Sequence, residues 1–324
     1  MEPLKNKSNN PLDENKQWMS RLPENLWDIP LYNISIPGSH DSMSYCLDKT
    51  SPLEPELPVL LSVLDKFVPC FARAIILRWA KTQALSVTQQ LNAGVRYLDL
   101  RIAHRPDDPS PVLYFAHGLF THITVKEAFL EILAWLLANP TEVVMLACRR
   151  VQDFTPEHHL HLISSLHSVF GPKLCPKHET PTLRVMWKMG YQVILSYDDV
   201  IAQFYDFLWP SVPYWWANTT SVNKLIHYLE ERKQEGRPAG GFFVAGLNLT
   251  EDFWYIVTHL FGSMKKMTIP KLPVMYLWVQ TQHPGKSGDA TNIIAEDLIG
   301  SDRFVSAVIN LNSKLILEKN PSPH

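Results

Sequence analysis

The stretch ISIPGSHDS, residues 34–42, decides how the rest of the sequence is interpreted. Its apolar alternation predicts the end of a strand at Tyr32–Ile36, and Pro37 and Gly38 are expected to stop that strand. His40 and Asp41 follow at once. Enzymes with an α/β barrel place catalytic side chains on the loops that follow their strands, so His40 and Asp41 are candidate catalytic residues. The alternative is a polar loop whose Ser and Asp residues only cap the next helix.

Length and composition indicate one globular domain of 324 residues, 46% hydrophobic and 19% charged, which is enough to bury a large core. The formal net charge of −2 excludes a strong global attraction to nucleic acid or to anionic lipid. The first sixteen residues lack the apolar core of a signal peptide, so we expect a cytoplasmic protein. The cysteines Cys46, Cys70, Cys148 and Cys175 have no zinc-site spacing and are expected to be free thiols.

About eight predicted strands alternate with helices from Trp18 onward. After Tyr32–Ile36 the strands are expected within residues 95–102, 112–116, 142–150, 190–198, 241–249, 274–279 and 291–295. This alternation predicts a single α/β domain, a (β/α)₈ barrel of the TIM type, over residues 18–317, with polar tails at 1–17 and 318–324. A doubly wound open sheet is the alternative, but no glycine-rich nucleotide turn follows the first strand.

The segment Val95–Ile102 alternates cleanly between apolar and polar residues. Its leucines and Ile102 are expected to face outer helices, which leaves Asp99 and Arg101 pointing inward. Such buried charges belong together as a pair. A structural ion pair on an edge strand is the alternative.

Seven polar residues of this kind follow or end different strands: His40, Asp41, Asp99, Arg101, His117, Arg149 and Asp297. Two histidines, acidic partners and an arginine are what phosphodiester cleavage needs without a metal. One imidazole takes a proton from a hydroxyl, the other gives a proton to the leaving oxygen, and the guanidinium fork holds the phosphate.

Four motifs, PGSHDS, GVRYLDLR, YFAHGL and NII-x-x-D, resemble the X domain of phosphatidylinositol-specific phospholipases C. The flanking WMSRLP, FLWPSVPYWWANTT and FVSAVINLN segments are similar to the PI-PLC X domain-containing proteins, and the likeness runs from Trp18 to Leu317. The resemblance implies a distorted (β/α)₈ barrel. It also implies cleavage of phosphatidylinositol at the glycerol–phosphate bond, with transient binding to membrane surfaces.

The resemblance also implies roles. His40 matches the general base for the inositol 2-hydroxyl, and Asp297 matches the carboxylate that orients it. His117 matches the general acid, supported by Asp41. Arg101 matches the phosphate-binding arginine of the bacterial enzymes, with Asp99 as its acidic neighbour.

Substrate contacts are assigned to Arg149, Tyr197, Trp215 and Trp216; the two tryptophans are candidates to replace an inositol-stacking tyrosine. Calcium-dependent relatives carry asparagine at position 41 and acidic residues at 101 and 149. Calcium requires several oxygen ligands, and two arginines would repel it, so we expect no metal and no other cofactor.

Three alternatives stay open. The barrel is an active phospholipase C, an inositol-phospholipid-binding module without turnover, or a metal-dependent glycerophosphodiesterase, which would need a cluster of Asp and Glu at the strand ends. Membrane contact is expected from Tyr214, Trp215, Trp216 and the apolar run Phe67–Trp79, against the alternative that these side chains fill the core.

Overall fold

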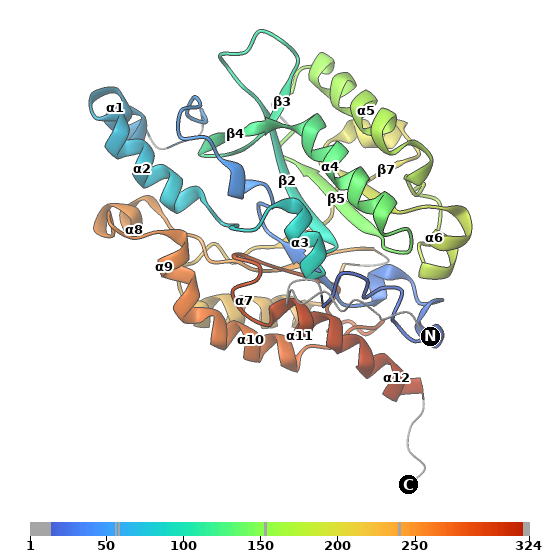
Figure 1. Ribbon diagram of the computed structural model, residues 1–324. Helices are drawn as coiled ribbons and strands as arrows, with labels where there is room; N and C mark the ends of the chain where they lie inside the picture. The colour runs from blue at the N-terminus through green and yellow to red at the C-terminus, as the bar shows by residue number, and fades with distance from the viewer. Residues whose placement is uncertain (1–13, 56, 58, 152–153, 239–240, 320–324) are drawn as a thin grey trace, which may run out of the picture.

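Eight parallel strands form a curled sheet at the centre of the computed structural model, which describes residues 14–55, 57, 59–151, 154–238 and 241–319 (Figure 1). Along the sheet the order is β7-β6-β5-β2-β1-β10-β9-β8, and every neighbouring pair is parallel. The strands are β1 (Ile36–Ser39), β2 (Tyr97–His104), β5 (Val144–Arg149), β6 (Val193–Tyr197), β7 (Leu208–Trp209), β8 (Tyr214–Trp215), β9 (Val244–Leu247) and β10 (Ile293–Glu296).

The two ends of this sheet, β7 and β8, follow each other in the chain. Within the described ranges no strand hydrogen bonds join them, and the barrel is open along this seam. Nη1 of Arg149 donates to the carbonyl of Val212 in the intervening loop, at 3.4 Å. The fold is therefore the expected distorted barrel of the α/β class.

An antiparallel hairpin, β3 (Leu113–His117) and β4 (Leu119–Thr124), extends the outer half of β2. The sequence predicted residues 112–116 as a barrel strand, which is wrong, because β3 pairs with β2 at Ile102↔Phe115 and runs in the opposite direction. The hairpin places His117 at its turn, where Gly118 adopts a positive φ of 72°.

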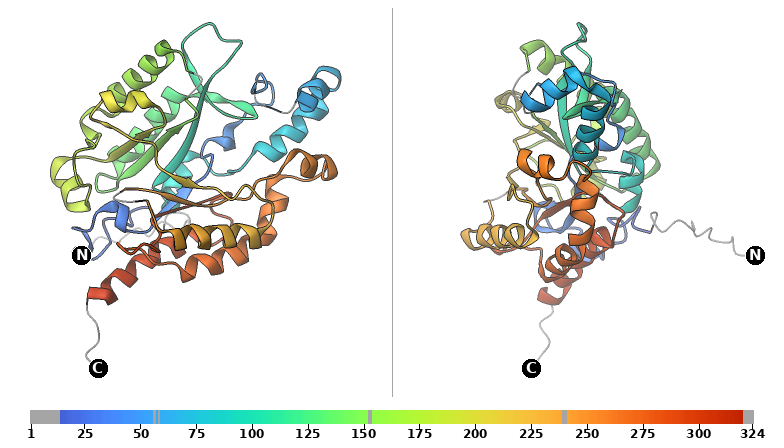
Figure 2. Two further views of the ribbon diagram at one scale, coloured as in Figure 1. Left: turned by 180° about the vertical axis from the view of Figure 1, so that it is seen from behind. Right: turned by 90° about the vertical axis from the view of Figure 1, so that its left-hand side faces the viewer.

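Helices cover the outside of the sheet, and Figure 2 shows α7 and α10 side by side along one flank. The larger helices are α1 (Val59–Phe67), α2 (Pro69–Ala80), α3 (Val87–Ala93), α4 (Val125–Ala138), α5 (Pro156–Phe170), α6 (Leu183–Met189), α7 (Val222–Glu235) and α10 (Leu272–Thr281). Shorter ones are α8 (Phe253–Thr258), α9 (Met264–Thr268), α11 (Phe304–Asn310) and α12 (Lys314–Lys319).

Local signals in the sequence account for several helix ends. Thr124 and Glu127 form a capping box at the start of α4. Gly94 ends α3 with a φ of 112°, and a Cβ there would lie 2.7 Å from Asn15. Pro69 begins α2 directly after α1 and so divides the two helices.

Two apolar clusters fill the two sides of the sheet. Leu98, Leu100 and Ile102 pack outward against the helices, as the alternation of β2 predicted. Tyr97 belongs instead to the cluster inside the barrel, which also contains Ile36, Ile194 and Ile293. The apolar interior ends where Asp99 and Arg101 begin, and this boundary positions the polar site.

Two further expected strands differ from the structure. Residues 274–279 lie in α10, where Pro273 occupies the first turn and allows a helix to start. The first strand runs through Pro37 and Gly38 rather than ending before them. The Pro37 carbonyl still accepts from the Arg96 N–H at 2.9 Å, and at Gly38 a Cβ would lie 2.9 Å from Tyr97, so glycine permits the close approach.

The expected polar tail at 1–17 is shorter at its inner end. Residues 1–13 lie outside the described residues, whereas the Lys16 carbonyl accepts from Nη2 of Arg96 and Asn15 donates to Ser306. Of the expected tail 318–324, α12 continues to Lys319 and the rest is outside the described residues. The four cysteines are free, as expected. Among the described helices, none has the length and apolar character needed to cross a bilayer.

Candidate active site

The pairing of β1 with β10 brings His40 and Asp297 together. Ser39 and Glu296 are register partners at the ends of these strands, so the residues that follow leave the sheet side by side. The backbone N–H of His40 donates to the Glu296 carbonyl at 3.2 Å. Nδ1 of His40 then lies 2.8 Å from Oδ1 of Asp297, which is fully buried.

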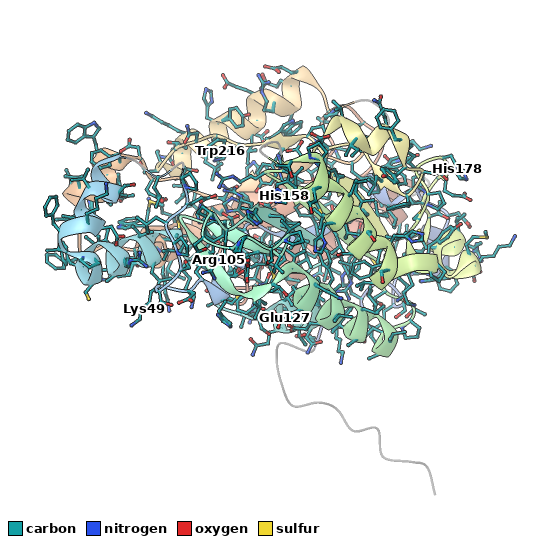
Figure 3. The ribbon with its side chains drawn as sticks, turned by 90° about the horizontal axis from the view of Figure 1, so that it is seen from above. Lys49, Arg105, Glu127, His158, His178 and Trp216 are labelled. Carbon is teal, nitrogen blue, oxygen red and sulfur yellow. The ribbon has the colours of Figure 1, made fainter. Side chains whose placement is uncertain are left out.

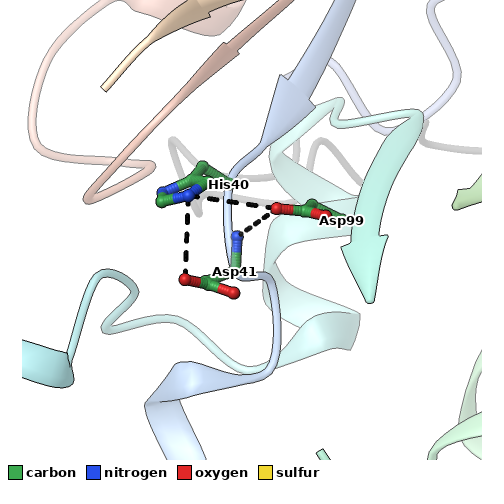
Figure 4. A group of neighbouring side chains, drawn as sticks. All are labelled: His40, Asp41 and Asp99. Carbon is green, nitrogen blue, oxygen red and sulfur yellow. Dashed lines mark hydrogen bonds and ion pairs between the residues drawn. The ribbon is translucent and has the colours of Figure 1, made fainter. Parts of the chain in front are cut away.

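The neighbouring strand β2 supplies Asp99 and Arg101 from its inward face. The Asp41 N–H donates to Oδ2 of Asp99 at 3.2 Å (Figure 4). The guanidinium of Arg101 contacts Asp41 and His40. Its Nε lies 2.6 Å from Oδ1 of Asp41, and its Nη2 lies 2.6 Å from Nε2 of His40. Asp99 is 3.6 Å from Nε of Arg101. The inward Asp–Arg pair expected from the sequence is thus present.

The hairpin turn brings His117 to the same cluster from outside the barrel. Its Nδ1–H donates to the carbonyl of Ala80 at 2.7 Å, and this fixes the ring. Nε2 of His117 lies 3.3 Å from Oδ2 of Asp41, and the same oxygen lies 3.7 Å from Nε2 of His40. Both imidazoles therefore approach one carboxylate oxygen.

The tautomer of His40 follows from its partners. An arginine can only donate, so Nε2 of His40 accepts from Arg101 and Nδ1–H donates to Asp297. In this neutral form the lone pair of Nε2 faces the cluster. The arrangement is that of a base oriented by a buried carboxylate.

Charges in the cluster shift several pKa values. Burial by itself would lower the pKa of His40, but the carboxylates of Asp41 and Asp297 outweigh it and raise that pKa above its ordinary value. Burial would raise the pKa of Asp41, yet the charges of Arg101 and His117 reverse this and hold it below its usual range. For Asp297, burial raises the pKa and His40 acts against the rise.

A second arginine and a tyrosine lie beside this cluster. The guanidinium of Arg149 stacks 5.2 Å from the ring centre of Tyr214, and its Nε is 3.9 Å from Asp99. The Tyr214 hydroxyl donates to Oδ1 of buried Asn248 at 2.9 Å. The rings of Tyr214 and His40 are 6.2 Å apart. The sequence placed Arg149 here but missed Tyr214 and Asn248 as site residues.

Two residues expected to bind substrate lie away from this cluster. Tyr197 is buried on the outer side of the sheet, where its hydroxyl contacts Nδ1 of His159 at 2.8 Å. Trp215 is only 8% exposed and packs 4.6 Å from Phe243. Both side chains pack in the apolar cluster on the outer side of the sheet, away from His40 and Asp297, and their contacts with substrate stay predictions.

Trp216 is 48% exposed and lies at the surface, where its indole N–H donates to Thr250 (Figure 3). Its contact with substrate stays a prediction.

The oxygen and nitrogen atoms of His40, Asp41 and Asp99 lie within 4.8 Å of one another, a spacing that suits metal ligands. In the structure these atoms already face Arg101, which contacts both His40 and Asp41. Calcium takes six to eight oxygen ligands, so a set with two carboxylates and a guanidinium beside it is a poor match.

Supporting contacts that the sequence did not reveal hold the strand ends in place. Nε2 of Gln83 donates to the carbonyls of His40 and Glu296, each at 3.0 Å, and its Oε1 accepts from the N–H of Ile299. Gln83 belongs to the TQAL segment, whose polar residues gave no periodic signal. One buried amide thus joins the loop after β1 to the loop after β10.

Positive φ values occur just beyond three strand ends of the site, at Asp41 (42°), Arg150 (61°) and Leu298 (57°). Each follows β1, β5 or β10. Non-glycine residues adopt this conformation at a cost, and such strain often accompanies functional sites. Here it turns the chain sharply at the ends where the charged side chains gather.

Comparison with known proteins agrees with this geometry. The family described as "Phosphatidylinositol-specific phospholipase C, X domain" matches residues 76–196. The phosphatidylinositol-specific phospholipase C from Listeria monocytogenes shares the fold, with a TM-score of 0.62 over 92% of this chain and 98% of that chain, at 19% identity. These findings define a phospholipase C-type barrel.

Two relatives in sequence define the family more narrowly. The human PI-PLC X domain-containing protein 1 is 50% identical over 93% of this chain and 94% of its own length. The mouse PI-PLC X domain-containing protein 3 is 40% identical over 91% and 92%. The chain belongs to the PI-PLC X domain-containing protein family.

Proposed function

We propose that this protein is a phosphatidylinositol-specific phospholipase C that cleaves the glycerol–phosphate bond by metal-independent acid–base catalysis. One observation carries the proposal: two imidazoles, His40 just after β1 and His117 on the hairpin, approach one oxygen of Asp41 at 3.7 and 3.3 Å. Two such groups on opposite sides of a reacting phosphate are suited to accept one proton and donate another.

In the first step Nε2 of His40 takes the proton from the inositol 2-hydroxyl. The 2-oxygen forms a bond to phosphorus while the bond from phosphorus to the glycerol oxygen breaks. Asp297 keeps the proton-accepting tautomer through its contact with Nδ1 and stabilises the imidazolium that forms. The product on the inositol side is a cyclic phosphodiester.

The leaving glycerol oxygen receives its proton from Nε2 of His117. The Ala80 carbonyl holds the opposite ring nitrogen, so Nε2 is the only ring position that faces the cluster. Asp41 lies beside that nitrogen and offers a negative charge to the protonated ring. The diacylglycerol then leaves neutral.

Arg101 binds the phosphate, and Arg149 with Tyr214 forms a wall for the inositol ring. Arg101 is about one-quarter exposed and reaches both Asp41 and His40, so its fork can turn to two phosphate oxygens. The flat face of Tyr214 lies next to His40, where the ring carrying the 2-hydroxyl must sit. The charge of Arg101 takes the place that a calcium ion would fill.

We assign membrane contact to an apolar rim made of Phe67, Val68, Phe71, Trp254 and Phe261. Phe67 is 80% exposed and Trp254 is 72% exposed. α1, α2 and α8 lie close together in Figures 1 and 2, and Trp79 on α2 contacts Tyr255 on α8 at 5.8 Å. Exposed aromatics of this kind insert at a lipid–water interface.

The test is to incubate the purified protein with phosphatidylinositol labelled in the inositol ring, with and without EDTA. We expect labelled cyclic inositol phosphate under both conditions, and none from a His40→Ala/His117→Ala double variant. Binding to phosphatidylinositol vesicles without any product would contradict the proposal and favour a lipid-binding module.

A further inference from the structure

A groove with a volume of about 200 Å³ lies between α2 and α8, next to the catalytic cluster. Its walls are apolar and include Leu61, Ile76, Trp79 and Ile256. One end is polar and is lined by Glu54, His117, Arg150 and Glu251. The groove is thus amphipathic along its length.

His117 belongs to both the groove and the catalytic cluster. Its ring lines the polar end of the groove, while its Nε2 contacts Asp41. Ala80, whose carbonyl fixes the ring, lines the groove as well. One end of a molecule bound in the groove would therefore lie next to His117, the group proposed to protonate the leaving oxygen.

Two groove residues carry buried polar atoms without a hydrogen-bond partner in the part of the chain that the structure describes. One is the indole Nε1 of Trp79, a residue only 3% exposed, and the other is Oε2 of Glu251. A buried polar atom left unpaired is destabilising by roughly 1–3 kcal/mol, so each of these two atoms lacks a partner that a molecule bound in the groove could supply. Burial also raises the pKa of Glu251 to about 7, so a fraction of this carboxyl is a neutral acid near pH 7.

We propose that this groove binds the glycerol end and the first methylenes of one acyl chain of the diacylglycerol leaving group, with the Trp79 indole donating to an ester carbonyl. This inference rests on the proposed function, because it extends the site on the leaving-group side of His117. An ester carbonyl accepts from the indole, and Glu251 offers a second polar contact at the polar end of the groove, beside His117.

The size and the surroundings of the groove select this occupant. Pockets that enclose a whole small ligand have about 300–1,000 Å³, so this groove takes part of a lipid. The apolar walls exclude a second inositol or phosphate group. The α2 and α8 walls also carry Phe71 and Trp254 of the apolar rim, so the remaining acyl chain stays in the bilayer.

The first experiment fills the groove from its solvent side. Ile256→Trp adds bulk at a half-buried wall position, and Val257→Trp, at the next residue on α8, is the matched control outside the groove. Substrates are monomeric dihexanoyl phosphatidylinositol and glycerophosphoinositol, which has no acyl chain. We expect Ile256→Trp to lower kcat/KM about ten-fold on the dihexanoyl substrate alone, the equivalent of losing roughly two buried methylenes.

The second experiment removes the donor. Trp79→Phe keeps an aromatic ring and deletes the N–H, and Trp187→Phe, whose indole donates to Thr141 far from the groove, is the control. We expect wild-type protein to prefer ester-linked over ether-linked dihexanoyl substrate, and Trp79→Phe to lose the preference. An unchanged preference would overturn the role of Trp79.

A binding measurement separates this inference from the proposed function. Calorimetric titration with dihexanoylglycerol reports on the groove without turnover, and the affinity should fall about ten-fold in Ile256→Trp but not in Val257→Trp. Phosphatidylinositol cleavage without such binding, or equal losses on both substrates, overturns the groove and leaves the function intact. Binding without any cleavage supports the groove and defeats the proposed function.

Discussion

Nη2 of Arg101 lies 2.6 Å from Nε2 of His40, so the side chain proposed to bind the phosphate donates to the nitrogen proposed to accept a proton. In the free protein the lone pair of Nε2 of His40 is therefore occupied by the hydrogen bond from Arg101. A substrate phosphate that draws the guanidinium away would free Nε2 when the substrate binds. Arrival of the substrate and release of the base are then one event.

This relationship predicts a pH effect. The charge of Arg101 works against the rise in the pKa of His40 that Asp41 and Asp297 cause. Arg101→Gln removes that charge, so the pKa of His40 rises further. Because His40 acts as a base only when neutral, the acidic limb of the kcat/KM profile moves to higher pH.

The measurement is kcat/KM on soluble phosphatidylinositol across the pH range. Arg149→Gln is the control, because Arg149 contacts Tyr214 and Asp99 rather than His40. It should lower activity without moving the acidic limb. A limb unchanged in Arg101→Gln would contradict the assignment of that limb to His40.

Each catalytic histidine should be worth a large factor in rate. His40→Ala and His117→Ala are each expected to lower kcat by roughly 10²–10⁴-fold, the usual contribution of one acid or base. His178→Ala removes an exposed histidine paired with Asp206 and should leave the rate unchanged. Near-normal activity in either catalytic variant, with its folding confirmed by circular dichroism, would refute that residue's role.

Activity should survive chelation. Turnover in EDTA is expected to equal turnover in plain buffer, since Arg101 supplies the positive charge at the phosphate. Arg101→Asp should not create calcium-dependent activity, because Arg149 remains beside Asp99. Activity that is lost in EDTA and restored by calcium alone would show that a metal is required.

The buried pair Arg96–Glu142 should govern stability rather than chemistry. Nη2 of Arg96 lies 2.6 Å from Oε2 of Glu142, and neither side chain is exposed. Glu142→Ala leaves a buried charge unpaired and is expected to lower the free energy of unfolding by about 3–5 kcal/mol in urea denaturation. Arg184→Met, which breaks an exposed pair with Asp28, is the control and should change little.

Membrane docking should depend on Trp254 and not on Trp215. Trp254→Ala is expected to reduce cleavage of bilayer phosphatidylinositol while leaving a soluble short-chain substrate unaffected. Trp215→Ala should lower both rates together, because its side chain packs against Phe243 and supports the barrel. Equal losses on both substrates for Trp254→Ala would remove this residue from the docking surface.

Much of the site could be read from local patterns. The alternation along β2 places Leu98 and Asp99 on opposite faces of the strand. Because the face with Leu98 packs against the outer helices, the face with Asp99 must point into the barrel. His40 and Asp297 were found because each directly follows a strand. Patterns of this kind lie within a few residues and survive in any tertiary context.

Other features depend on contacts that no local pattern reveals. Tyr214, Trp215 and Trp216 are three aromatics in a row, and only the register Tyr214↔Val244 decides which of them reaches the site. Residues 274–279 form a continuous apolar run, which fits a buried strand as well as a buried helix. Glu251 and Trp79 lie far apart in sequence and meet only in the groove.

The open seam between β7 and β8 divides the sheet into two parts that come from different halves of the chain. The chain before Pro210 supplies β1, β2, β5, β6 and β7, and the chain after it supplies β8, β9 and β10. Among the described strands, β1 and β10 alone join these two parts by a ladder. That ladder ends at Ser39 and Glu296, and His40 and Asp297 follow directly and contact each other. The protein can therefore be regarded as two complementary fragments. Their association brings His40 and Asp297 together, so phospholipase activity would measure how well the two fragments reassociate.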